Sequence, residues 1–127
     1  MILGIGIDMV EGRRLERWRA RPGLLERYFH PDELAYALAA GPGAALSLAA
    51  RFAAKEAFGK ALGTGLAGMA LADIAVENAP AGRPELRLYR TALAALEKSG
   101  ARRAHLSLAH EGGLAVAMVA LESPPYF

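Results

Sequence analysis

The 127-residue chain contains no cysteine, which excludes a disulfide framework and any metal site built on thiolate ligands. Its three histidines do not show zinc-site spacing, and no serine lies in a nucleophile-elbow motif. Two common kinds of catalytic centre, a zinc site and a Ser-His-Asp triad, are therefore not indicated.

Long hydrophobic runs are also missing. No segment reaches the roughly 20 consecutive apolar residues of a membrane-spanning helix. The first eight residues lack the basic start and long apolar run of a secretory signal. We therefore expect a cytoplasmic protein without a membrane partner.

What remains is the composition of an ordinary globular protein, with 54% hydrophobic and 22% charged residues. A chain of this length forms one core more readily than two, so we expect a single domain over residues 1–127. The predicted strands cover residues 2–10, 74–77, 85–89, 105–109 and 114–122, and the predicted helices 12–21, 31–39, 45–62 and 91–99. This order predicts an α+β fold, with a mainly antiparallel sheet packed against the long helix 45–62.

That long helix carries charges where a purely structural helix would have apolar residues. At about 100° per residue, Lys55 and Glu56 share a face with Leu48, Phe52 and Gly59. Lys60 lies one turn beyond Glu56, and Gly63 is expected to end the helix in the left-handed conformation. Since buried charges need partners, the segment indicates a binding site.

Two carboxylates are candidates for that site. Asp8 ends the apolar strand Gly4-Ile5-Gly6-Ile7-Asp8, and Glu56 lies on the long helix. Together with phosphate oxygens and water, two such groups are a common way to hold Mg²⁺. The simpler interpretations are that Asp8 caps the following helix and that Glu56 pairs with Lys60 four residues later.

Positive charge accompanies these acids. Arg51, Lys55 and Lys60 give the long helix an excess of cations, which favours a phosphate ligand over a simple salt-bridge network. His110 ends a predicted strand and could bind a phosphate oxygen or transfer a proton, although such a histidine is more often merely structural.

The helix 12–21 carries four arginines on one face: Arg13, Arg14, Arg17 and Arg21. Such a row is usually a solvated surface. With an isoelectric point of about 9.2, it also suits an acidic partner, either an acidic protein or nucleic acid. The net charge of +2 is small for a dedicated nucleic-acid-binding protein.

Three segments together closely resemble the holo-acyl-carrier-protein synthases, the small bacterial branch of the 4′-phosphopantetheinyl transferases. They are Gly4 to Asp8, Arg51 to Gly65, and Leu106 to His110. The resemblance extends over nearly the whole chain, including Gly82-Arg83-Pro84. One departure is Ala109, which stands where the family usually has a hydroxyl residue.

The resemblance implies an enzyme that transfers the phosphopantetheine arm of coenzyme A to a serine of apo-acyl carrier protein, in fatty acid biosynthesis. Adenosine 3′,5′-bisphosphate is released. By this resemblance Asp8 and Glu56 bind Mg²⁺, while Lys60, Lys55 and Gly63 lie at the coenzyme A phosphates. The base that takes the serine proton is either Glu56 or a metal-bound water.

The same resemblance implies a homotrimer with sites between subunits, in which His110 reaches the phosphates from a neighbouring subunit. The arginines Arg13, Arg14, Arg17 and Arg21 then dock the acidic carrier protein. Two other functions stay open. A nucleic-acid-binding module explains the arginine row but not Asp8 and Glu56, whereas another Mg²⁺-dependent nucleotide or coenzyme A pyrophosphohydrolase explains the carboxylates.

Overall fold

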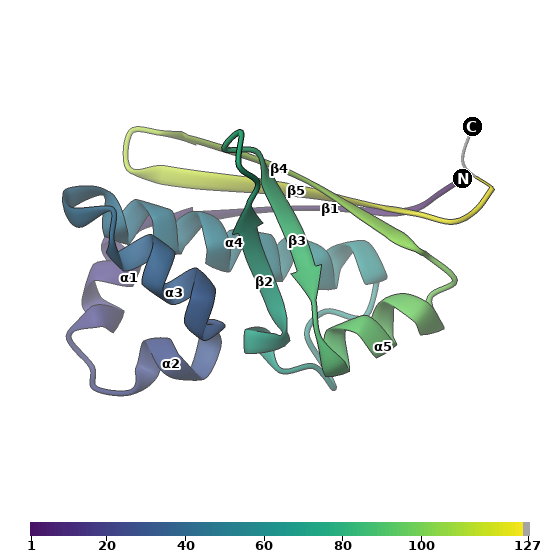
Figure 1. Ribbon diagram of the computed structural model, residues 1–127, viewed down its shortest axis with the longest axis horizontal. Helices are drawn as coiled ribbons and strands as arrows, with labels where there is room; N and C mark the ends of the chain where they lie inside the picture. The colour runs from purple at the N-terminus through teal and green to yellow at the C-terminus, as the bar shows by residue number, and fades with distance from the viewer. Residues whose placement is uncertain (126–127) are drawn as a thin grey trace.

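The computed structural model describes residues 1–125, and the last two residues of the expected irregular tail lie outside the described part. Figure 1 shows the elements along the chain. In order they are β1 (Ile2–Glu11), α1 (Gly12–Arg19), α2 (Leu24–Tyr28), α3 (Pro31–Leu38), the 3₁₀ turn η1 (Gly41–Gly43), α4 (Ala44–Leu62), the 3₁₀ turn η2 (Leu71–Asp73), β2 (Ile74–Asn78), β3 (Pro84–Leu88), α5 (Arg90–Lys98), β4 (Arg103–Glu111) and β5 (Leu114–Glu122).

The strands form two antiparallel sheets. One has the order β1-β5-β4 and the other is the β2–β3 hairpin. The long helix α4 packs against β1 and β5, while the β2–β3 hairpin crosses it in Figure 1. The α+β fold with antiparallel sheets and a long helix is therefore confirmed.

Local signals in the sequence account for two of the helix ends. Gly63 adopts the left-handed conformation after α4, with φ of 79°, as expected for a helix C-terminus. At the start of α3, the side chains of His30 and Glu33 form a reciprocal capping box. Two expectations were wrong: α1 ends at Arg19, and the short helix α2 was not anticipated.

Gly4 and Gly6 allow β1 to lie directly on the backbone of α4. A Cβ atom on Gly4 would stand 1.9 Å from the carbonyl oxygen of Ala61, and one on Gly6 would stand 1.9 Å from that of Ala57. No larger residue fits at such a distance without moving the strand. Because side chains alternate along a strand, Asp8 points to the same helix-facing side as these glycines.

The core surrounds α4, which is buried on most of its circumference. Its small side chains allow close approach of the neighbouring elements. The buried alanines of this helix are Ala44, Ala49, Ala50, Ala53, Ala54, Ala57 and Ala61. Phe52 and Phe58 occupy the larger spaces between this helix and its neighbours.

A charged pair is buried inside this core. The Nζ of Lys55 lies 2.5 Å from Oε2 of Glu33 and donates to the carbonyl oxygens of Leu71 and Ile74. Burial lowers the pKa of Lys55, and the charge of Glu33 opposes that shift. The pair and its hydrogen bonds join α3, α4 and the start of β2, so Lys55 has a structural role here.

None of the helices described for residues 1–125 is long and apolar enough to cross a membrane.

We predict that Gly6→Ala lowers the free energy of unfolding by about 3 kcal/mol or more, because the added methyl group meets backbone that cannot yield. Urea denaturation followed by circular dichroism measures this change. The control is Gly12→Ala, where the nearest atom to a new Cβ is 3.4 Å away, and it should leave stability nearly unchanged. Equal stability of the Gly6 variant and the wild type would contradict the close packing of β1 on α4.

Candidate active site

The packing of β1 on α4 brings together three of the residues singled out in the sequence. Asp8 comes from β1, and Glu56 and Lys60 come from successive turns of α4. The Nζ of Lys60 donates to Oδ1 of Asp8 at 3.0 Å and to the Ile7 carbonyl oxygen at 2.9 Å. Lys60 thus pairs with Asp8 rather than with Glu56, so the expected i,i+4 pair on the helix is not the main contact.

Glu56 lies beside this pair without a direct partner. Among residues 1–125 its carboxylate makes no hydrogen bond or salt bridge. Partial burial raises the pKa of Glu56, and the negative charge of Asp8 adds to the shift, while Arg14 and Lys60 oppose it. Two neighbouring carboxylates, one of them destabilised in its charged form, are an arrangement that favours cation binding.

Arg14 is the fourth charged group at this place. Its guanidinium carbon lies 5.1 Å from the ring centroids of both Trp18 and Phe52. The two rings pack edge to face, with centroids 4.9 Å apart. This aromatic support holds Arg14 close enough to oppose the rise in the pKa of Glu56.

Two cations that the sequence suggested for this site lie elsewhere. Lys55 is fully buried against Glu33, and the side chain of Arg51 is occupied by Ser47 and Asn78, each at 2.7 Å. Both face α3 and β2, not β1. The expectation that Lys55 binds phosphate is therefore wrong, because the helical wheel could not show which sector of α4 other elements cover.

Helix α4 ends at Gly63, as the sequence predicted. Beyond Gly63 the chain turns back, and the Gly65 amide donates to the Gly59 carbonyl oxygen at 3.0 Å. A Cβ on Gly59 would come within 2.7 Å of the Gly65 backbone. This glycine-rich turn lies one helical turn beyond Lys60, and its backbone can approach a ligand closely.

His110 lies on the same sheet as Asp8 but apart from it. Asp8 pairs with Ala117 of β5, and His110 pairs with Ala115, so both side chains point to the helix-facing side. Strand β5 separates them, which gives a Cα separation of roughly 12 Å from standard sheet spacings. His110 is exposed and makes no hydrogen bond or salt bridge to the acids within residues 1–125.

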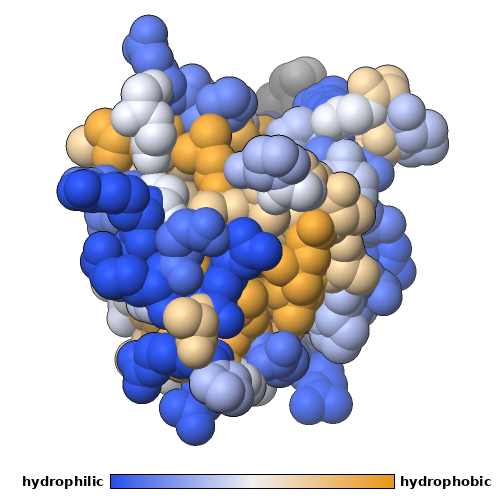
Figure 2. Space-filling model, turned by 90° about the vertical axis from the view of Figure 1, so that its left-hand side faces the viewer, coloured by the Kyte–Doolittle hydropathy of each residue, from blue (hydrophilic) through white to orange (hydrophobic). Residues whose placement is uncertain are grey.

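The arginine row is shorter than expected. Arg13 and Arg17 are exposed on α1, while Arg21 lies past the end of the helix, beside Arg27 in a shallow pocket. Arg13 lies 3.4 Å from Glu11. Figure 2 faces the end of the molecule that carries α1, α2 and α3, and shows hydrophilic side chains gathered beside a hydrophobic strip. A charged surface next to apolar groups is suited to a protein partner.

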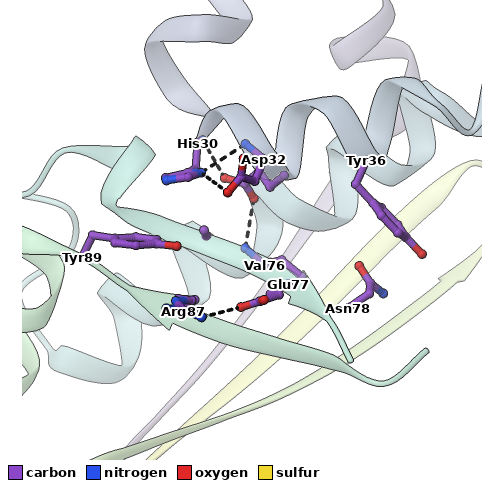
Figure 3. A pocket seen from close by; sticks show the side chains of 10 residues that line it. His30, Asp32, Tyr36, Val76, Glu77, Asn78, Arg87 and Tyr89 are labelled. Carbon is purple, nitrogen blue, oxygen red and sulfur yellow. Dashed lines mark hydrogen bonds and ion pairs between the residues drawn. The ribbon is translucent and has the colours of Figure 1, made fainter. Parts of the chain in front are cut away.

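Sequence reasoning missed a second pocket, of about 290 Å³, between α3 and the β2–β3 hairpin. Figure 3 shows its polar groups, among which the His30 ring stacks on Tyr89 at 4.6 Å and Arg87 pairs with Glu77. Its acid Glu33 accepts from the backbone amides of His30 and Val76. Because these groups largely satisfy one another, we assign this pocket a structural role.

The residues present fit a cation held by two protein groups. No cluster of three or more histidine, aspartate or glutamate side chains that could hold a metal is found in residues 1–125. Asp8 and Glu56 are adjacent, and Glu56 lacks another partner. Such a pair suits Mg²⁺, which commonly takes one or two carboxylates and leaves its other positions to water and substrate phosphates.

Comparison with known proteins shows the family of the chain. Residues 4–119 match the family model of the 4′-phosphopantetheinyl transferase superfamily. The holo-[acyl-carrier-protein] synthase of Treponema denticola is 60% identical over 122 residues, which cover 96% of this chain and 99% of that protein. The synthase of Trichlorobacter lovleyi is 53% identical and covers 98% of this chain and 100% of the relative.

Solved structures show the same fold. The crystal structure of the Neisseria meningitidis synthase aligns with a TM-score of 0.86 and 36% identity, over 97% of this chain and 100% of the other. The Bacillus anthracis synthase, solved in complex with CoA (3′,5′-ADP), aligns with a TM-score of 0.80 and 36% identity, over 98% and 99% of the two chains. The chain therefore belongs to the holo-[acyl-carrier-protein] synthases of the 4′-phosphopantetheinyl transferase superfamily.

Proposed function

We propose that this protein transfers the 4′-phosphopantetheine arm of coenzyme A to a serine hydroxyl of apo-acyl carrier protein, releasing adenosine 3′,5′-bisphosphate, in fatty acid biosynthesis. The observation that supports this activity is the proximity of Asp8, Glu56 and Lys60 where β1 packs on α4. The named relatives and the coenzyme A complex of the Bacillus anthracis protein support the substrate pair. We propose the cytoplasm as its location.

Asp8 and Glu56 would hold Mg²⁺, which when bound supplies positive charge against the pyrophosphate. The exposed ammonium of Lys60 is long enough to reach a phosphate oxygen from its place beside Asp8. The backbone turn from Gly63 to Gly65 would approach the phosphates at the end of α4. The base that accepts the serine proton is either Glu56 or a water molecule.

The site of one chain lacks a group that the family uses, since His110 stands apart from the acids. The outward face of β1 and β5 is apolar and exposed, with Ile5 64%, Ile7 56% and Met9 63% accessible. Met118 on β5 extends this surface. We propose that copies of the chain cover this face in a homotrimer, which brings His110 of one subunit to the acids of another.

The carrier protein would dock on α1. Arg17 is exposed and has no ion pair among residues 1–125, so it is free to meet an acidic surface. Arg14 is different, because it contacts Trp18 and Phe52 and acts on Glu56. Arg14 thus joins the docking surface to the reacting centre, and Arg13 and Arg21 extend that surface on either side.

Incubation with coenzyme A, Mg²⁺ and apo-acyl carrier protein should increase the intact mass of the carrier by one phosphopantetheine arm. We predict that Glu56→Gln lowers the rate by at least about 100-fold, because one of two carboxylates for the metal is lost, while the circular dichroism spectrum is unchanged. Hydrolysis of coenzyme A without modification of the carrier would instead identify a pyrophosphohydrolase. Transfer by the Glu56 variant at the wild-type rate would refute the metal-binding role.

Arg17→Glu should raise the Michaelis constant for the carrier protein by about tenfold and leave that for coenzyme A unchanged, because it reverses an exposed charge away from the acids. Lys98→Glu on α5 is the matched control and should alter neither constant. Steady-state kinetics with each substrate varied in turn measures the effect. Equal increases in both constants would contradict docking on α1.

Ile7→Glu should convert the trimer to monomers and abolish transfer, since a charge placed on the apolar sheet face opposes its burial. Light scattering after size-exclusion chromatography measures the mass. Leu93→Glu, on an exposed position of α5, should leave both mass and transfer unchanged. A wild-type protein that is monomeric and fully active would refute the shared site.

A further inference from the structure

Asp8 already has a cation beside it in the chain itself. The Lys60 ammonium lies 3.0 Å from Oδ1 of Asp8 and 2.9 Å from the Ile7 carbonyl oxygen. The Asp8 side chain is 19% exposed, whereas that of Lys60 is 53% exposed. The carboxylate is thus fixed on its strand, and the ammonium can leave it by rotation of a flexible stem.

The two acids of the site differ in their direct partners. Asp8 has the Lys60 ammonium on one oxygen, while Glu56 has no hydrogen bond or salt bridge within the described chain. Arg14 lies with the aromatic pair Trp18 and Phe52 and acts on Glu56 only from a distance. A dication held by both acids therefore competes with the Lys60 ammonium at Asp8.

We propose that Lys60 competes with the divalent cation for Asp8, so that metal binding and substrate binding are coupled through one ammonium group. This inference rests on the proposed function of the site. When the cation takes the Asp8 oxygen, the Lys60 hydrogen bond is lost and the ammonium turns to the phosphates of the substrate. Without an anionic substrate, the same ammonium favours the state in which Asp8 is paired with it.

Electrostatics gives the competition its direction. A positive charge about 3 Å from a metal-binding oxygen repels a dication and occupies one of the oxygen's lone pairs. The second hydrogen bond, to Ile7, belongs to the backbone of β1 and holds the ammonium at the site independently of Asp8. An anion close by offsets this cost, because it supplies Lys60 with a new partner.

The test is Mn²⁺ binding followed by electron paramagnetic resonance, with no substrate present. We expect Lys60→Met, which keeps the apolar stem, to bind Mn²⁺ on the order of tenfold more tightly than the wild type. Lys60→Arg keeps the charge and should stay within about threefold of it. Lys98→Met is the control for loss of a positive charge elsewhere and should bind Mn²⁺ as the wild type does.

The second measurement repeats the titrations with adenosine 3′,5′-bisphosphate. This anion should strengthen Mn²⁺ binding more in the wild type than in Lys60→Met. Of these two proteins, only the wild type has an ammonium group that can turn from Asp8 to the phosphates of the anion. Tighter Mn²⁺ binding by Lys60→Met together with slower phosphopantetheine transfer is the expected combination. If Lys60 had a purely structural role, its substitution by Met would not tighten Mn²⁺ binding.

Equal or weaker Mn²⁺ binding by Lys60→Met overturns the competition, as does the absence of Mn²⁺ binding in every variant. Either result leaves the proposed function standing if the wild type still modifies the carrier protein. Conversely, tighter Mn²⁺ binding by Lys60→Met, together with a wild type that does not modify the carrier protein, overturns the proposed function alone. Circular dichroism of each variant establishes that the fold is intact.

Discussion

The direct contact between the backbones of β1 and α4 is the constraint on which the site depends. Gly4 and Gly6 have no side chain because the carbonyl oxygens of Ala61 and Ala57 stand where a Cβ would be. Two residues further along the strand, Asp8 arrives beside Glu56 and Lys60. A shift of the strand by even one residue would turn Asp8 away from the helix, since strand side chains alternate between faces.

The same helix separates two kinds of charge. Toward α3 and β2, Lys55 pairs with Glu33 in the dry core, where the pair holds several elements together. Toward β1, Glu56 and Lys60 remain partly exposed and lack the full set of hydrogen bonds that Lys55 has. Loss of one partner from a buried, hydrogen-bonded charge pair destabilises a fold, whereas poorly satisfied charges near solvent remain available for a ligand.

Within one chain His110 lies apart from the acids, and the exposed sheet face gives a physical reason for the assembly that we propose. The side chains of Ile5, Ile7 and Met9 lie opposite to Asp8 on β1, so the strand that supplies the carboxylate also carries the apolar surface. His110 stands one strand beyond β5 on the helix-facing side. We therefore propose that assembly through this sheet and completion of the site both follow from the alternation of β1 side chains between the two faces of the sheet.

The sequence by itself determined the α+β order and the end of α4 at Gly63, and it singled out Asp8, Glu56 and Lys60 as site candidates, because these depend on local patterns and on a recognisable family motif. Only the tertiary structure decided that Lys55 is buried, that Lys60 pairs with Asp8, and that Arg21 leaves the row. A helical wheel gives directions around one helix axis. It does not show which neighbouring element packs on each side of the helix. That packing decides which side chains are buried and with which groups they pair.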